Sequence, residues 1–132
     1  MKFIPVNKPS INNSDIKIVN KCIRSGWVSS SGKYINLFEQ NFKKKVKRKY
    51  AVAVSSGTAA LDIAIKSLNL KAGDEVIVPN FSIISCVNEI IREKLKPIFI
   101  DADPLTLNMN LDLLEKKITK KNKAIIVVHI YG

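Results

Sequence analysis

A chain of 132 residues, with 46% hydrophobic and 25% charged residues, has the composition of a single globular domain. Its apolar runs, such as Ala124–Val128, are too short to cross a bilayer, and its first residues lack the apolar core of a secretion signal. Because Cys22 and Cys86 are far apart and His129 is the only histidine, a disulfide framework and a zinc site have little support. We therefore expect a cytoplasmic protein without a metal site or a membrane partner.

The chain is strongly basic, and one segment concentrates the charge. The net charge is +11, and six basic residues lie within the run Lys43–Lys49. Such a run can bind nucleic acid or an anionic surface, or it can be the solvated end of a helix. Specific contacts with phosphates and bases favour arginine, yet the chain has 19 lysines and three arginines. We favour the solvated helix end and expect no nucleic-acid partner.

Two helices are predicted before residue 50. The first spans residues 13–25, where apolar side chains recur at helical spacing, and Gly26 is suited to end it. After a loop at 26–32, an amphipathic second helix is predicted, because an apolar residue recurs at every fourth position. This second helix ends in the basic run. The apolar positions are Ile16, Val19 and Ile23 in the first helix, and Tyr34, Phe38, Phe42 and Val46 in the second.

From residue 51 onward, short apolar strands alternate with helices. Strands are predicted at 51–54, 75–78, 97–100 and 124–128. Helical stripes of apolar residues lie between them, at Leu61–Leu68, Ile83–Ile91 and Leu111–Ile118, and Asn110 is suited to cap the last one. Apolar strands that alternate with helices indicate a parallel sheet covered on both faces. The sequence therefore predicts the α/β class, with a three-layer αβα architecture and a mainly parallel sheet.

Ligands in folds of this kind bind at the carboxyl ends of the strands. Here those ends are residues 55–57, 79–81, 101–103 and 129–131. No helix follows the last predicted strand to cover it, so we expect the 132 residues to form part of a longer fold.

The segment Ser55–Thr58 follows a predicted strand and opens a predicted helix. Free backbone N–H groups and the helix dipole attract an anion at such a point, and Gly57 allows a phosphate to approach the backbone. The hydroxyls of Ser56 and Thr58 can donate further hydrogen bonds. Neither GxxxxGK[ST] nor GxGxxG is present, so an ATP loop or a dinucleotide site is not indicated. The alternative is an ordinary helix cap without a ligand.

Two other kinds of site have weaker support. Asp101 and Asp103 could form an acid pair or bind a metal, but we favour a turn followed by the Pro104 helix-entry region. A serine nucleophile would need His129 as its base, and no serine lies in a GxSxG pattern. A lone histidine at a strand end is more often structural. We therefore predict neither a metal centre nor a hydrolase site.

Several segments share their order and spacing with a known family from about Lys21 to the last residue. They are Ser25–Ser30, Val54–Leu61, Gly73–Pro79, Pro97–Pro104 and Val128–Gly132. These segments resemble the DegT/DnrJ/EryC1/StrS family of pyridoxal-phosphate (PLP)-dependent aminotransferases, which act on nucleotide-linked keto-sugars. The resemblance implies the N-terminal part of the large domain of the aspartate-aminotransferase (type I) fold. Residues 1–50 would form helices and a substrate-side loop, and residues 51–132 the start of the sheet.

The resemblance also implies roles for particular residues. Ser56, Gly57 and Thr58 would hold the phosphate of PLP. Ile83 takes the position of an aromatic residue that stacks on the cofactor ring, and the chain departs from the family here because isoleucine is not aromatic. Trp27 and Ser30 would lie near the nucleotide-sugar substrate, in a loop often reached across a dimer interface.

The family's Schiff-base lysine and the carboxylate facing the pyridinium nitrogen are expected beyond Gly132, since no lysine of this chain matches the family's lysine motif. The 132 residues alone are therefore predicted to be inactive. The whole enzyme would be a homodimer that transfers an amino group from glutamate to a nucleotide-diphosphate keto-sugar. The alternatives are a truncated, non-catalytic protein of the same fold and a basic nucleic-acid-binding module.

Overall fold

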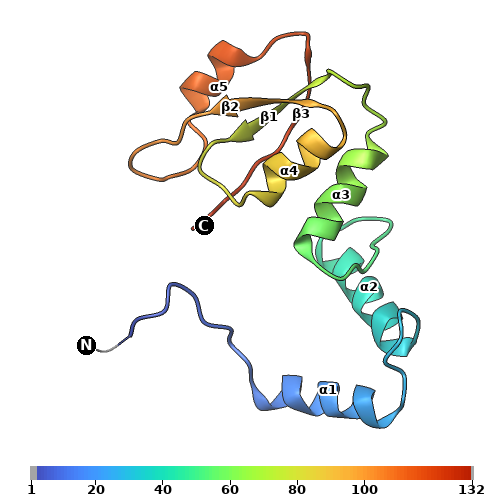
Figure 1. The fold of residues 1–132 in the computed structure, drawn as a ribbon. Coiled ribbons are helices and arrows are strands. Elements are labelled where there is room, and N and C mark those ends of the chain that lie inside the picture. The colour runs from blue at the N-terminus through green and yellow to red at the C-terminus, as the bar shows by residue number, and fades with distance from the viewer. Residues whose placement is uncertain (1–2, 132) are drawn as a thin grey trace. The chain divides into compact units, whose positions relative to one another are not determined.

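The computed structural model describes residues 3–131. The chain divides into two compact units, Met1–Ala53 and Val54–Gly132 (Figure 1). The first unit contains two helices, and the second contains the sheet with the remaining helices.

The first unit begins with helix α1, Asn13–Arg24. Asn12 caps it in a capping box: its side chain accepts a hydrogen bond from the Asp15 backbone N–H, and its own N–H donates to Asp15 Oδ2 at 2.9 Å. Beyond the C-cap Ser25, Gly26 adopts φ +73°, which glycine tolerates without steric cost. The predicted helix and its glycine stop are confirmed.

Helix α2, Lys33–Lys45, is the second helix of this unit. Phe38 and Phe42 lie one turn apart and stack with their ring centroids 5.7 Å apart. Three lysines occupy the last turn, so the helix ends in the basic run as predicted. Lysines are favourable there because the carboxyl end of a helix carries partial negative charge.

The strand predicted at 51–54 is wrong. No strand pairs with this segment within residues 3–131, and the Val52 side chain is 75% exposed. The Ala53 N–H instead donates to the Glu39 side chain at 2.8 Å. A strand needs a partner ladder, and apolar composition alone does not supply one.

The second unit contains a parallel sheet with the strand order β2-β1-β3. Strand β1 spans Glu75–Pro79, β2 spans Lys96–Ile100 and β3 spans Asn122–Ile125. Strand β1 lies in the centre and pairs with β2 in register, Ile77 opposite Ile98, and with β3 through a register shift next to Glu75. The parallel sheet is confirmed, although β3 begins and ends earlier than the predicted strand at 124–128.

Helices cover both faces of this sheet. Helices α3, Gly57–Ser67, and α4, Ser85–Arg92, pack on the face that receives Val76 and Val78 (Figure 1). Helix α5, Leu111–Lys117, contributes Leu114 to the opposite face, with Ile77. Side chains alternate along a strand, so β1 supplies both cores. This is the predicted three-layer arrangement, and Asn110 caps α5 as expected.

The buried face of α4 differs from the predicted stripe. Cys86, Glu89 and Ile90 are buried, whereas Ile83 and Ile84 are 62% and 67% exposed. The helix begins at Ser85 rather than near residue 83, so the first two isoleucines precede it and are not part of its stripe. As a result, the Glu89 carboxylate lies on the face of α4 that packs toward α3.

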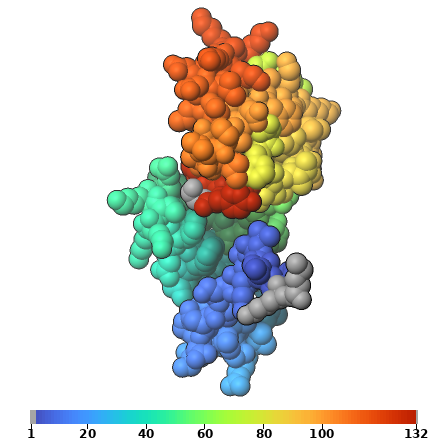
Figure 2. Space-filling view, turned by 90° about the vertical axis from the view of Figure 1, so that its left-hand side faces the viewer, coloured from blue at the N-terminus to red at the C-terminus, as the bar shows by residue number. Residues whose placement is uncertain are grey.

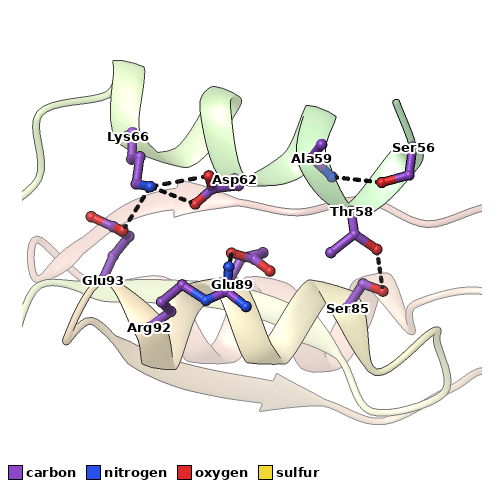
Figure 3. Close-up of polar contacts among 9 residues, drawn as sticks. All are labelled: Ser56, Thr58, Ala59, Asp62, Lys66, Ser85, Glu89, Arg92 and Glu93. Atoms are coloured by element: carbon purple, nitrogen blue, oxygen red, sulfur yellow. Dashed lines mark hydrogen bonds and ion pairs between the residues drawn. The ribbon is translucent and has the colours of Figure 1, made fainter. Parts of the chain in front are cut away.

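Glu89 is fully buried, and a second carboxylate lies across from it on α3 (Figure 3). Arg92 Nη1 lies 3.4 Å from Glu89 Oε2, but neither Glu89 oxygen accepts a hydrogen bond from residues 3–131. Asp62 has a closer counter-charge than Glu89, because Lys66 Nζ lies 2.9 Å from its Oδ1 and 3.0 Å from its Oδ2. A buried carboxylate whose single counter-charge makes no hydrogen bond to it reduces the stability of the fold.

Both cysteines are free, as the sequence indicated. Within the described residues, no helix is long and apolar enough to span a membrane, and no cluster of side chains could hold a metal ion.

Candidate functional site

The segments that follow β1 and β2 meet at one edge of the sheet. Asn80 follows β1 and Asp101 follows β2, and the Asn80 Nδ2 donates to Asp101 Oδ1 at 2.8 Å. The Ala102 N–H donates to the same oxygen at 2.8 Å. These hydrogen bonds, first from Asn80 and then from Ala102, lower the pKa of Asp101 below its ordinary value of 3.8. The sequence placed both residues at strand ends but did not show that they bond.

The amino end of α3 is the candidate anion site. Ser56 is the N-cap, and its Oγ accepts the Ala59 N–H at 3.1 Å. The next helix donor, the Ala60 N–H, bonds the Ser56 carbonyl at 3.1 Å. Within residues 3–131, no acceptor takes the N–H groups of Gly57 and Thr58. Ser56 is thus a helix cap. The N–H groups of Gly57 and Thr58 and the Ser56 hydroxyl proton remain free to donate to an anion.

A second hydroxyl joins this site from α4. Thr58 Oγ1 and Ser85 Oγ lie 3.1 Å apart and form a hydrogen bond (Figure 3). One proton of the pair is used between the two oxygens, so one O–H remains free to donate elsewhere. Sequence reasoning missed Ser85, because 27 residues separate it from Thr58 and only the packing of α3 against α4 brings them together.

The space and charge at this point fit a phosphate group. A Cβ added at Gly57 would meet nothing within 4 Å, so the approach to the backbone is open. The first turns of α3 and α4 contain no acidic residue that would repel an anion. Free N–H groups, hydroxyl donors and the positive end of a helix dipole together form a donor set suited to phosphate.

Ile83 was singled out from the sequence, and an aromatic residue, Phe81, lies two positions before it. Ile83 lies between β1 and α4 and is 62% exposed. Phe81, two residues earlier, faces Tyr131 with ring centroids 6.3 Å apart and ring planes tilted by 47°. Tyr131 follows β3, so this aromatic pair links the segments after two neighbouring strands. The stacking role of Ile83 remains a prediction.

The predicted substrate residues lie in the other unit. Trp27 is 57% exposed, and its ring is close enough to Gly32 that a Cβ there would lie 3.5 Å from Trp27 Cε3. Gly32 has φ +150°, a conformation that other residues rarely adopt. Ser30 is exposed in the same loop. Their contact with a sugar nucleotide remains a prediction.

The loop after β2 forms a turn around Asp103. Asp103 Oδ1 accepts hydrogen bonds from the backbone N–H groups of Leu105 and Thr106 and from the Thr106 hydroxyl. These bonds, those from Thr106 first, lower the pKa of Asp103 below 3.8. The turn borders an open cavity of about 500 Å³ that His129 also lines.

These carboxylates predict how stability depends on pH. The hydrogen bond from Lys66 lowers the pKa of Asp62, and the bonds described above do the same for Asp101 and Asp103. A folded-state pKa below the unfolded value of 3.8 stabilises the native state above that pH. We therefore expect the urea midpoint, followed by circular dichroism, to be constant near neutrality and to fall as the pH drops through 3.8. Asp101→Asn should make this fall shallower, because the amide keeps both hydrogen bonds without the charge; an unchanged slope would contradict the assignment.

Comparison with known proteins decides the family. Residues 9–132 match the sequence model of the DegT/DnrJ/EryC1/StrS aminotransferase family. The chain belongs to this family. The family resemblance of its motifs is thereby confirmed, and so is the α/β fold of PLP-dependent aminotransferases.

Two relatives are GDP-perosamine synthases. The chain is 46% identical to the enzyme of Escherichia coli O157:H7 and 45% identical to that of Vibrio cholerae. The matches cover 100% and 98% of this chain but 36% and 35% of those proteins. The chain thus spans about a third of the length of the relatives it matches.

Solved structures agree in fold. An E. coli GDP-4-keto-6-deoxy-D-mannose-3-dehydratase with bound hydrated PLP gives a TM-score of 0.88 at 31% identity, covering 97% of this chain and 34% of that one. An aminotransferase from Psychrobacter cryohalolentis gives 0.82 at 32% identity, covering 94% and 32%. The family and a solved neighbour with bound PLP support PLP as the cofactor of this family member. The hydrogen-bond donors at the amino end of α3 suit the phosphate group of PLP.

Proposed function

We propose that this chain forms the cofactor-phosphate part of an aminotransferase that acts on a GDP-linked 4-keto-6-deoxy sugar. The observation that carries the proposal is the open donor set at the amino end of α3, in a chain 45–46% identical to two GDP-perosamine synthases. Bound PLP supplies an electron sink, which lets an amino group move between an amino acid and a keto group.

The residues of this chain would hold and orient the cofactor. The N–H groups of Gly57 and Thr58 would donate to phosphate oxygens, and the free proton of the Thr58–Ser85 pair would add a third donor. The Ser56 hydroxyl would donate while it continues to cap the helix. Fixing the phosphate fixes the cofactor's position in the site, which is a precondition for catalysis by orientation. Ile83 would place an aliphatic face, rather than an aromatic one, next to the ring.

Dehydration is the second candidate reaction, because a solved neighbour is a 3-dehydratase that binds PLP. Its identity of 31% is lower than the 45–46% of the perosamine synthases, which favours amino transfer. Glutamate as amino donor is supported by a neighbour solved with glutamate joined to PLP. Transfer itself needs a Schiff-base lysine, and none of the lysines here matches the family's motif. A cytoplasmic homodimer, with Trp27 and Ser30 near the sugar nucleotide, completes the proposal.

Removing the hydroxyl pair should weaken phosphate binding selectively. We expect the double variant Thr58→Val, Ser85→Ala to lower the affinity of the chain for pyridoxamine phosphate about 10- to 100-fold, the effect of losing one charge-assisted hydrogen bond. Thr58→Val alone should have a smaller effect, because the Ser85 hydroxyl is then free to donate. The measurement is the anisotropy of the ligand's own fluorescence during titration. Pyridoxamine, which lacks the phosphate, should bind wild type and variant equally weakly.

Ser67→Ala is the matched control, because this hydroxyl lies at the other end of α3 and bonds the Ala64 carbonyl. It should leave the affinity unchanged. If wild type binds pyridoxamine phosphate no better than pyridoxamine, the amino end of α3 is not a phosphate site in this chain.

A further inference from the structure

Polar side chains lie in successive layers between α3 and α4, one helical turn apart (Figure 3). Thr58 and Ser85 form the first layer, with their hydroxyl oxygens 3.1 Å apart at the candidate phosphate site. Asp62 and Glu89 follow four residues later on their helices, so they lie across from each other one turn behind the hydroxyls. The packing of α3 on α4 therefore places two carboxylates behind the donors for the phosphate.

The two carboxylates are not neutralised equally. Lys66 Nζ lies 2.9 Å and 3.0 Å from the two Asp62 oxygens, and it also lies 3.8 Å from Glu93 at the end of α4. The counter-charge of Glu89 is weaker, because Arg92 lies 3.4 Å away without a hydrogen bond to the carboxylate and is 61% exposed. Solvent screens an exposed charge more than a buried one, so a net negative charge remains at Glu89.

Glu89 is fully buried between two helices of one unit, whose close packing Figure 2 shows in yellow to red. The core beside it is apolar, with Val76 and Val78 from β1. Further protein around the chain would add to this cover and leave the charge equally buried. A structural role does not account for Glu89, because an apolar side chain suits such a core better. Locally unfavourable groups concentrate at functional sites, and Glu89 lies one turn from Ser85.

We propose that Glu89 limits the affinity of the phosphate site by repelling the bound anion, which keeps the phosphate-bearing ligand exchangeable. The inference rests on the proposed function, because it concerns the anion at the amino end of α3. A phosphate oxygen bonded to the Ser85 hydroxyl would lie roughly 8 Å from the Glu89 carboxylate, which is one helical turn plus one hydrogen bond.

The size of the effect follows from this separation. At roughly 8 Å and an effective dielectric constant of about 20, two unit charges repel enough to lower an affinity about 30-fold. Arg92 offsets part of the Glu89 charge, so we expect the net effect to be about three- to tenfold. Asp62 contributes less, because Lys66 neutralises it on its own helix.

The test compares wild type with Glu89→Gln, which removes the charge and keeps the size of the side chain. Glu89→Gln should bind pyridoxamine phosphate about three- to tenfold more tightly, measured by the anisotropy of the ligand's fluorescence. Arg92→Met, which removes the counter-charge, should bind it about two- to threefold more weakly. Pyridoxamine, which lacks the phosphate, should bind all three proteins equally. Circular dichroism checks that the variants keep their helices.

The matched control is Glu115→Gln, which removes the same charge from an exposed position on α5, the helix that covers the opposite face of the sheet. It should leave the affinity unchanged. An equal gain in Glu115→Gln and Glu89→Gln would overturn the inference, because net charge alone would then explain it. If wild type prefers pyridoxamine phosphate to pyridoxamine but Glu89→Gln binds no more tightly, this inference alone is wrong. If wild type shows no such preference, the proposed function fails as well.

Discussion

Arg92→Met is expected to destabilise the second unit by about 2–3 kcal/mol, because it leaves the buried Glu89 carboxylate without a counter-charge. The estimate lies below the usual range for a buried pair, since Arg92 itself is 61% exposed and the two side chains lack a hydrogen bond. Glu89→Met should have the opposite sign and stabilise by about 1–2 kcal/mol, because an apolar side chain suits the core between α3 and α4.

The double variant identifies the cause. With Glu89→Met in place, Arg92→Met should cost less than about 0.5 kcal/mol, because no buried charge remains to be stranded. Hydrogen exchange of the β1 amides measures the stability of the second unit, since β1 is central to its sheet. Tryptophan fluorescence would report on the first unit instead, because the only tryptophan, Trp27, lies there. If Arg92→Met costs the same in both backgrounds, its effect comes from lost packing and not from Glu89.

Gly57→Ala is expected to separate ligand binding from stability. Gly57 is the first residue of α3, its φ is not positive, and an added Cβ meets no protein atom within 4 Å. Alanine should therefore be tolerated and should raise stability slightly, up to about 1 kcal/mol, because it has the better helix propensity. The methyl group would occupy the space through which an anion approaches the backbone, so affinity for pyridoxamine phosphate should fall by more than about 100-fold.

The same fluorescence titration, with urea unfolding in parallel, measures both effects. Gly73→Ala is a useful contrast, because Gly73 lies in a turn before β1 with φ +88°, where alanine is strained. That variant should lose stability and keep its affinity. Retained affinity in Gly57→Ala would show that the ligand phosphate does not approach this backbone.

The sequence was sufficient for the elements whose causes are local. A capping side chain, a glycine beyond the last turn and apolar residues at fixed spacing act within a few residues of each other. For that reason α1, α2 and α5 agree with their predicted positions, including the caps at Gly26 and Asn110. Uniformly apolar strands between helices were likewise enough to indicate a parallel sheet, because such strands are stable only when both faces are covered.

The features that depend on a distant partner required the tertiary structure. Residues 51–54 have the composition of a strand but no neighbour to pair with among the described residues. Glu89 lies within the predicted helical segment Ile83–Ile91 but is not one of its apolar residues, and it is buried because α4 turns that side toward α3.

Ser55–Thr58 shows both contributions at one site. The sequence by itself determined that Gly57, flanked by Ser56 and Thr58, opens a helix. Free N–H groups and the positive end of the helix dipole therefore occur at this point. Only the tertiary structure decided that Ser56 caps the helix while Ser85 meets Thr58 from another helix, 27 residues along the chain. The physical reason is that backbone donors arise from local helix geometry, whereas a hydroxyl pair between two helices exists only after those helices have packed.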